Sequence, residues 1–167
     1  FMTPRRADFP IGFLAAGTSR RIVDVPKCPI ATDAINASLA RARKDIRGNP
    51  GRFERGATLL FRDCEEGVVT DPRQVVTEKV GAIQLKFLAG EFFQNNPSVL
   101  EQFVGHAIQL AHDSGAKHLV DTYCGSGLFA LSGARRFESV NGVEVSAEAA
   151  CKAAENATLN RLLNCRF

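Results

Sequence analysis

The chain has 167 residues, of which 45% are hydrophobic and 23% charged, and its formal net charge is +3. This is the length of about one domain of roughly 150 residues, and the composition excludes a largely disordered or collagen-like chain. The longest apolar runs are far shorter than the roughly 20 residues of a membrane helix, so we expect no membrane association.

The five cysteines lie far apart, and no two of them form a C-x-x-C pair. We therefore expect no zinc, iron–sulfur or other metal site built from this chain. No secretory signal opens the chain, and scattered cysteines without such a signal favour a reducing compartment. We expect an intracellular protein, in the cytoplasm, the nucleus or a mitochondrion.

Charge is distributed unevenly. Residues 1–56 carry eleven Lys or Arg against five Asp or Glu, a net charge of +6, whereas residues 57–167 carry ten against thirteen, a net charge of −3. A basic stripe can bind a nucleic-acid backbone by releasing its counterions, although a solvated helix face and basic loop have the same composition. The candidate RNA-binding side chains are Arg41, Arg43, Lys44, Arg47, Arg52 and Arg55, with Arg5, Arg6, Arg20 and Arg21 also in the basic part.

The first third of the chain is expected to form a strand pair followed by a helix. Residues 11–14 and 21–25 are short apolar segments, which predicts paired strands. Thr32 or Asp33 is a suitable N-cap for a helix with apolar residues at helical spacing, and residues 48–51, Gly-Asn-Pro-Gly, are a stop signal.

Residues 57–89 are expected to form an antiparallel β meander. Their β-branched residues and the turn residues between them predict four strands, at 57–61, 67–70, 74–80 and 82–88. Together with the preceding helix, this meander gives an α+β domain over residues 1–90.

Residues 91–167 alternate helices with strands. Asn95 or Asn96 caps a helix that has Pro97 in its first turn, and Gly115 ends that helix. Alternation of this kind predicts βαβ units, a parallel sheet and an α/β fold class. The later elements are expected as a strand at 118–123, a helix at 128–136, a strand at 139–145, a helix at 147–160 and a third strand from 164.

A glycine turn follows the first of these strands. The strand ends in Asp121, turns through Gly125 and Gly127, which allow positive φ and close approach of a ligand, and enters a helix. Glu144 follows the next strand, 17 positions after Gly127. In a parallel α/β sheet both acidic residues fall at the carboxyl ends of adjacent strands, where ligands bind. A carboxylate there can accept hydrogen bonds from both hydroxyls of a ribose.

Two ligands compete for this turn. Gly125-x-Gly127-x-x-Ala130 satisfies the motif of NAD(P)-dependent oxidoreductases. S-adenosylmethionine sites instead use an acidic residue at the end of the strand before the glycines, where Asp121 stands and where a dinucleotide site has an apolar residue. The amino group of the methyl donor benefits from that carboxylate, so the sequence favours S-adenosylmethionine over the dinucleotide and over a turn with no ligand.

The residues around this turn resemble the RNA uracil-5-methyltransferases. Residues 121–127, Asp-Thr-Tyr-Cys-Gly-Ser-Gly, are similar to the methyl-donor motif of that family, and residues 87–96 to its Phe-x-Gln-x-Asn segment. Residues 28–36 and 55–63 resemble its central domain, so the resemblance covers about residues 9–167. It is greatest to the fungal-type enzymes that act on the T-loop uridine of tRNA.

The resemblance implies the fold, the activity and the partners. Residues 1–90 match a central, RNA-facing domain, and residues 91–167 match the first half of a Rossmann-like domain that binds S-adenosylmethionine. The activity implied is methylation of uridine C5 in RNA, with tRNA as the partner. The alternatives that stay open are an NAD(P)-dependent oxidoreductase domain and a non-catalytic RNA-binding module with a vestigial turn.

The resemblance also implies roles for individual residues. Gln94 and Tyr123 match residues at the methyl donor, although a helix cap and a core aromatic are the respective structural alternatives. Glu144 matches the acidic residue that holds the ribose hydroxyls, and Gly125 and Gly127 match the turn glycines.

The matching region carries no catalytic residue. In the relatives the catalytic cysteine and the base lie beyond the third strand, so Cys124 is expected to be structural. The chain ends before that region, and residues 1–3 resemble the middle of a protein, so we expect an inactive fragment of a longer enzyme. Leu128 stands where several bacterial relatives have an asparagine that touches the donor, and that contact is not expected here.

Overall fold

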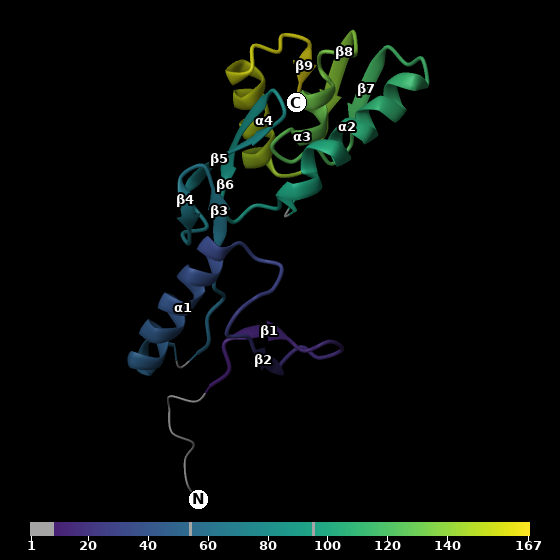
Figure 1. The fold of residues 1–167 in the computed structure, drawn as a ribbon. Coiled ribbons are helices and arrows are strands. Elements are labelled where there is room, and N and C mark those ends of the chain that lie inside the picture. The colour runs from purple at the N-terminus through teal and green to yellow at the C-terminus, as the bar shows by residue number, and fades with distance from the viewer. Residues whose placement is uncertain (1–8, 54, 95) are drawn as a thin grey trace, which may run out of the picture. The chain divides into compact units, whose positions relative to one another are not determined.

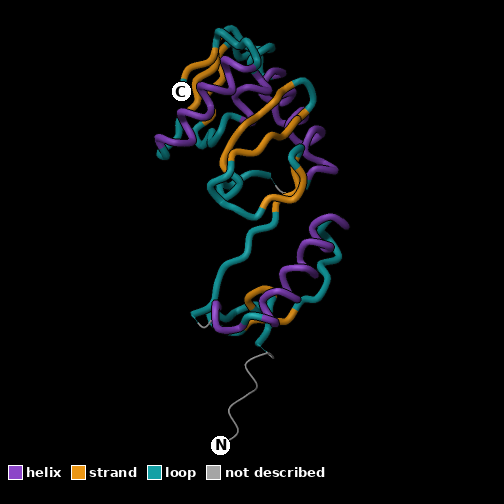
Figure 2. Tube along the Cα trace, turned by 90° about the vertical axis from the view of Figure 1, so that its left-hand side faces the viewer, coloured by secondary structure: helices purple, strands orange, loops and turns teal. Residues whose placement is uncertain are grey.

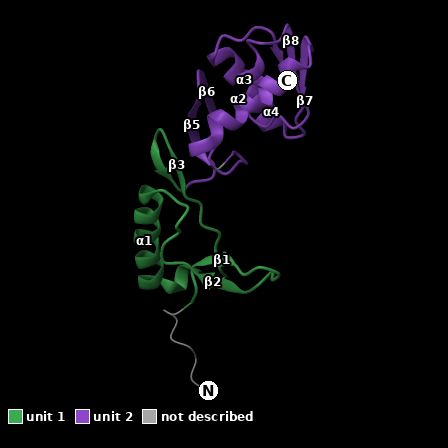
Figure 3. Ribbon diagram, turned by 45° about the vertical axis from the view of Figure 1, so that its right-hand side comes forward, with its two compact units in different colours: residues 1–70 green, residues 71–167 purple. Residues whose placement is uncertain are grey.

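The computed structural model describes residues 9–53, 55–94 and 96–167. These residues form two compact units, which divide between Thr70 and Asp71 (Figure 3). Residues 1–3, Arg5, Arg6 and Asn95, named above, lie outside the described residues. Within the described ranges, no helix is long and apolar enough to cross a membrane.

The first unit contains one long helix and two small antiparallel hairpins (Figure 1). The Thr32 side chain accepts a hydrogen bond from the N–H of Ile35 and caps the helix, as predicted. The first strand pair and the helix are confirmed. The elements are β1 (Gly12–Leu14) paired with β2 (Ile22–Asp24), α1 (Asp33–Gly48), a 3-10 helix (Pro50–Phe53), and β3 (Arg62–Cys64) paired with β4 (Gly67–Val69).

Arg43, on α1, ties the β1–β2 hairpin to the helix. Its Nη1 donates hydrogen bonds to the carbonyl oxygens of Ile11 at 2.7 Å and Val25 at 3.1 Å. Its Nη2 donates to the carboxylate of Asp24 at 2.7 Å, and only 8% of the Arg43 side chain is exposed. A buried charge is tolerated when it is paired and hydrogen-bonded, so this cluster anchors a hairpin whose own residues are largely exposed.

This cluster predicts a loss of stability in acid. The Arg43 hydrogen bond and the N–H of Ile11 lower the pKa of Asp24 from 3.8 to about 2. Because the folded-state pKa lies below the unfolded one, the stabilisation is present above about pH 4 and disappears as the pH falls toward about 2. Urea unfolding of the wild type across this pH window should show the loss of stability. Its size is reduced because solvent screens the partly exposed Asp24. Equal pH dependence in Asp24→Asn would contradict the assignment.

The second unit contains a β-hairpin and a three-stranded parallel sheet, whose strands lie beside helices of the same unit (Figure 2). The sheet order is β7-β8-β9, which confirms the predicted βαβ units. The Asn96 side chain caps α2, and Gly115, with φ of +77°, follows its C-terminal end. The elements are β5 (Val75–Val80), β6 (Ile83–Leu88), α2 (Pro97–Asp113), β7 (His118–Asp121), α3 (Leu128–Gly133), β8 (Ser139–Gly142), α4 (Ala147–Leu159) and β9 (Cys165–Arg166).

The predicted antiparallel meander is confirmed for the strands at 67–70, 74–80 and 82–88, which occur as β4, β5 and β6, but these strands do not form one sheet. Residues 57–61 form no strand, and β3–β4 and β5–β6 are separate two-stranded sheets. Between them, the carbonyl of Pro72 accepts a hydrogen bond from the N–H of Gly90 at 2.9 Å. This contact closes the base of the β5–β6 hairpin against the Asp71–Pro72 turn.

The boundary between the compact units lies between Thr70 and Asp71, not after residue 90 as predicted. The β5–β6 hairpin belongs to the second unit, because side chains of Asn156 and Asn160 bind the backbone of β6. The ring of Phe87 on β6 also stacks on that of Phe93, with centroids 4.4 Å apart. The hairpin therefore packs with the parallel sheet and its helices.

Candidate functional site

Asp121 and Glu144 come from neighbouring strands and lie at the same end of the sheet. Asp121, the last residue of β7, is in register with Gly142, the last residue of β8, and Glu144 follows two residues later. Beyond the strand ends, the N–H of Val143 donates to the carbonyl of Asp121 at 2.8 Å, and the N–H of Cys124 donates to the carbonyl of Val143 at 3.1 Å. The glycine turn is thus fastened to the segment that carries Glu144.

Two left-handed glycines shape the turn. The φ angles are +51° at Gly125 and +98° at Gly127, which disfavour residues with a side chain. A Cβ at Gly127 would lie 2.9 Å from Leu131 Cδ1, whereas a Cβ at Gly125 would meet no atom within 4 Å. Gly127 is therefore packed against the protein, and Gly125 faces open space in which a ligand can approach the backbone.

Glu144 holds the turn from the side of β8. Its Oε1 accepts a hydrogen bond from the N–H of Ser146 at 2.9 Å, and its Oε2 accepts one from the N–H of Gly125 at 3.0 Å. These bonds lower the pKa of Glu144, so the carboxylate is ionised at neutral pH. Each oxygen keeps a further lone pair, so Glu144 can also accept hydrogen bonds from ligand hydroxyls.

Asp121 has the opposite electrostatic setting. Burial raises the pKa of Asp121, and the Glu144 charge acts in the same direction, whereas the N–H groups of Tyr123 and Ala130 lower it. The N–H of Ala130, in the first turn of α3, donates to Asp121 Oδ2 at 3.2 Å. A positive charge bound beside this partly buried carboxylate would favour its ionised form.

Tyr123 is not a core aromatic and Gln94 is not a helix cap, the two structural alternatives given for these residues. Tyr123 is 91% exposed, so it is not a core aromatic. The cap of α2 is Asn96, so Gln94 is not the helix cap. Gln94 is half-buried next to Phe93, and no hydrogen bond joins its side chain to another described residue.

Cys124 has the setting of a structural cysteine. The residue is 5% exposed, and burial, reinforced by the charges of Asp121 and Glu144, raises its pKa to about 11. The thiol is therefore protonated at neutral pH, whereas a nucleophilic cysteine acts as the thiolate. In the described ranges, no group of three or more His, Cys, Asp or Glu side chains could hold a metal ion.

The six basic candidates of the first unit divide into two kinds. Arg43 is buried in the cluster with Asp24, so its guanidinium is directed at the protein and not at a phosphate. Arg47 and Arg52 lie 3.8 Å and 4.0 Å from the carboxylates of Asp24 and Asp45. The candidates that remain exposed are Arg41, Lys44, Arg47, Arg52 and Arg55.

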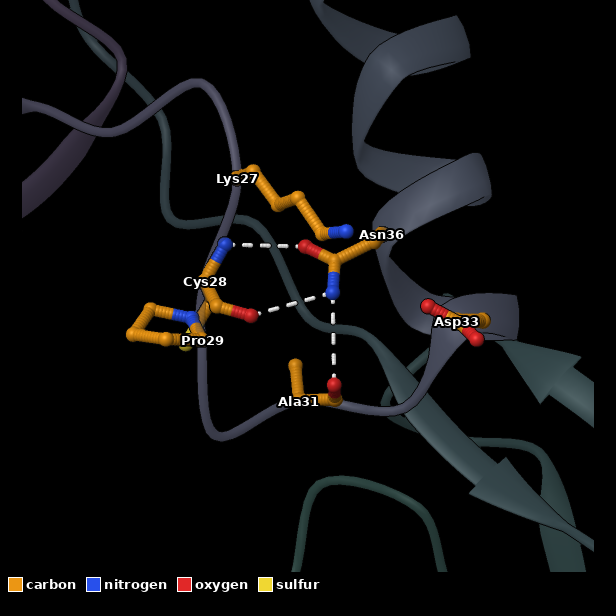
Figure 4. Close-up of a pocket in the computed structure, with 6 residues that line it drawn as sticks. All are labelled: Lys27, Cys28, Pro29, Ala31, Asp33 and Asn36. Atoms are coloured by element: carbon orange, nitrogen blue, oxygen red, sulfur yellow. Dashed lines mark hydrogen bonds between the residues drawn. The ribbon is translucent and has the colours of Figure 1, made fainter.

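A hollow lies beside the N-terminal end of α1 (Figure 4). The Asn36 amide accepts a hydrogen bond from the N–H of Cys28 at 2.8 Å and donates to the carbonyls of Cys28 and Ala31 at 3.0 and 3.2 Å. Since that amide is engaged in bracing the loop before α1, we assign the hollow a structural origin. Its lining residues are Lys27, Cys28, Pro29, Ala31, Asp33 and Asn36.

Sequence reasoning missed the two asparagines that join α4 to β6. Asn156 is 1% exposed and donates hydrogen bonds to the carbonyls of Lys86 and Ser126, the second of which lies in the glycine turn. Asn160 accepts a hydrogen bond from the N–H of Gln84 and donates one to the carbonyl of the same residue. A signal was available, because Asn is a poor helix former and stands here in an alanine-rich helix.

Comparison with known proteins identifies close relatives. The chain is 42% identical over 169 residues to the tRNA (uracil(54)-C(5))-methyltransferase of Schizosaccharomyces pombe, covering 94% of this chain and 32% of that protein. It is 32% identical over 200 residues to the protein of the same name from Saccharomyces cerevisiae, covering 92% and 31%. The chain thus spans about a third of the length of these relatives.

The fold is similar to that of a solved archaeal enzyme. The tRNA (uracil-54, C5)-methyltransferase of Pyrococcus abyssi, in complex with S-adenosyl-L-homocysteine, superposes with a TM-score of 0.65 at 18% identity, covering 88% of this chain and 49% of that one. This likeness supports the expected Rossmann-like fold of the second unit. The model of the family tRNA (Uracil-5-)-methyltransferase matches residues 65–167, more than half of the chain. The resemblance read from the motifs is therefore confirmed, and the chain belongs to the tRNA (uracil-5-)-methyltransferase family.

Proposed function

We propose that the protein containing this chain transfers a methyl group from S-adenosylmethionine to C5 of a uridine in RNA, and that this uridine lies in the T-loop of tRNA. The names of the two fungal relatives support the reaction and the substrate. The observation that carries the donor site is the pair of carboxylates, Asp121 and Glu144, flanking the open backbone at Gly125. These residues bind the donor and take no part in the chemical step.

Each donor-binding residue has a place suited to one part of the ligand. Glu144, ionised and with free lone pairs, accepts hydrogen bonds from the two ribose hydroxyls. Asp121 stabilises the positive charge of the donor, and the exposed ring of Tyr123 and the amide of Gln94 complete the pocket. The donor supplies an electrophilic methyl group on its sulfonium.

A dinucleotide fits this turn less well. Dinucleotide sites place the pyrophosphate on the N–H groups at the start of the helix. Here the N–H of Ala130 in that first turn already donates to the carboxylate of Asp121. A pyrophosphate bound there would have to displace the Asp121 carboxylate from the N–H of Ala130, which disfavours the oxidoreductase alternative.

Isothermal titration of the full-length protein tests the donor assignment. S-adenosylhomocysteine, the demethylated product of the donor, should bind in a single-site isotherm, and NADH should release no heat of binding. Binding of NADH without binding of S-adenosylhomocysteine would overturn the proposal and favour the oxidoreductase alternative.

We infer that the RNA-facing part of the predicted domain 1–90 is its first unit, residues 1–70. The exposed basic side chains of the first unit, Arg41 and Lys44 among them, are suited to bind phosphates, whereas Arg43 has a structural role. Such contacts make RNA binding weaker as the salt concentration rises. Removing one of them should lower the slope of log binding constant against log salt concentration by about one.

Replacement of Cys124 should spare the reaction. We expect full-length Cys124→Ser to keep its rate of methyl transfer to tRNA within about threefold of wild type, because the protonated thiol takes no part in chemistry. Incorporation of radiolabelled methyl groups measures this rate. A loss of three orders of magnitude in a folded variant would show that Cys124 is the nucleophile.

A further inference from the structure

Two asparagines at the end of α4 hold the outer edge of β6. Asn160 accepts a hydrogen bond from the N–H of Gln84 at 2.9 Å and donates one to its carbonyl at 2.7 Å. Asn156 does the same with the N–H and carbonyl of Lys86, at 2.8 and 3.0 Å. Four helical residues rise about 6 Å and two strand residues about 6.6 Å. Successive amides on the helix therefore match alternate peptide groups on the strand.

The two asparagines differ in their remaining bond. The Nδ2 of Asn156 also donates to the carbonyl of Ser126 at 3.0 Å, within the glycine turn. The corresponding bond of Asn160, which caps the C-terminal end of α4, goes back to the carbonyl of Asn156 at 2.7 Å. Asn156 is 1% exposed and Ser126 is 6% exposed, so water does not replace this bond readily. Of the two asparagines, therefore, only Asn156 joins three segments: α4, β6 and the glycine turn.

We propose that Asn156 is a positioning residue for the methyl donor, an inference that rests on the proposed function. Ser126 lies between Gly125 and Gly127, the two residues of the turn with the greatest backbone freedom. Glu144 holds the turn from one side through the N–H of Gly125, and Asn156 holds it from the other through the carbonyl of Ser126. With both bonds in place, the turn has one conformation before the donor arrives.

The same amide aligns the two halves of the donor pocket. β6 leads directly into the loop that carries Gln94, and the Phe87–Phe93 stack holds that loop against the strand. Gln94 therefore comes from the segment that Asn156 binds at Lys86, and Tyr123 comes from the segment that it binds at Ser126. A shift of β6 relative to the turn would move these two donor-contacting side chains apart.

Asn156→Ala and Asn160→Ala form a matched pair of variants in the full-length protein. Each loses one pair of bonds to β6, but only the first loses the bond to the donor turn. Well below the unfolding midpoint of both variants, S-adenosylhomocysteine should bind about tenfold more weakly to Asn156→Ala, and within about twofold of wild type to Asn160→Ala. The Michaelis constant for tRNA should stay the same in both variants.

The outcomes separate this inference from the proposed function. If wild-type protein does not bind S-adenosylhomocysteine, the proposed function is overturned. If wild type binds it and the two variants weaken binding equally, or neither does, Asn156 contributes only to the packing of the hairpin and the inference fails.

A measurement on wild-type protein covers the case in which Asn156→Ala does not fold. The N–H of Lys86 is bonded to Asn156 and that of Gln84 to Asn160, so the two amides report on the two asparagines. Bound S-adenosylhomocysteine should slow hydrogen exchange at Lys86 by severalfold more than at Gln84. Equal protection of the two amides would overturn the inference.

Discussion

Glu144→Ala in the full-length protein should weaken the binding of S-adenosylhomocysteine by about a hundredfold. In the proposed donor site, the variant removes an ionised acceptor of two hydrogen bonds from the ribose hydroxyls, and hydrogen bonds to a charged group contribute about 1.5–3 kcal/mol each. At the lower end of that range, two bonds correspond to about a factor of a hundred in the dissociation constant. Isothermal titration with wild type and variant at the same pH measures the change.

Glu148→Ala is the matched control for this experiment. Glu148 is exposed in the first turn of α4, and its replacement removes the same charge without touching the glycine turn. Its affinity should remain that of wild type. Because Glu144 also accepts bonds from Gly125 and Ser146, the unfolding midpoint of each variant is measured alongside. Unchanged affinity in Glu144→Ala would favour a non-catalytic RNA-binding module with a vestigial turn.

Arg43→Met should destabilise the first unit by about 1–3 kcal/mol, because it removes the buried donor shared by two carbonyl groups and the partly exposed carboxylate of Asp24. Methionine retains most of the aliphatic volume, so the loss comes from the polar contacts with Asp24, Ile11 and Val25. Hydrogen exchange in the full-length protein gives the measurement. The N–H of Val25, bonded to the carbonyl of Ile11 at 2.9 Å, reports on the hairpin directly.

Lys44→Met separates this effect from a general loss of charge. Lys44 is the next residue along α1 and is exposed, so its replacement removes one positive charge without opening the cluster. Exchange at Val25 should be unchanged in this variant, and RNA affinity should fall. If both methionine variants speed exchange to the same extent, the anchoring role of Arg43 is refuted.

Local signals in the sequence were sufficient for the helices and the parallel sheet. Thr32 and Asn96 cap α1 and α2 because their side chains accept hydrogen bonds from N–H groups of the first helical turn. Gly115 follows the end of α2 because it adopts a positive φ. The placement of Asp121 and Glu144 at one edge of the sheet also follows from the strand–helix alternation alone, since parallel strands end on the same side.

Contacts between distant residues decided what the sequence did not predict. The β5–β6 hairpin belongs with the parallel sheet because Asn156 and Asn160 bind residues 70 and 76 positions earlier in the chain. Arg43 resembles its exposed basic neighbours in every local respect, and only its burial against Asp24 distinguishes it. Neither the hydrophobic periodicity nor the turn residues of a sequence predict which side chains pair when they lie so far apart in the chain.

The asparagine pair on α4 constrains how this domain tolerates insertions and deletions. Side chains four apart on the helix match peptide groups two apart on the strand, so the two elements share one register. Adding one residue to α4 between Asn156 and Asn160 would rotate the second amide by about 100° away from the strand. Length changes are therefore expected to be accepted in the turn between β5 and β6, and to be rejected in α4 and β6 themselves.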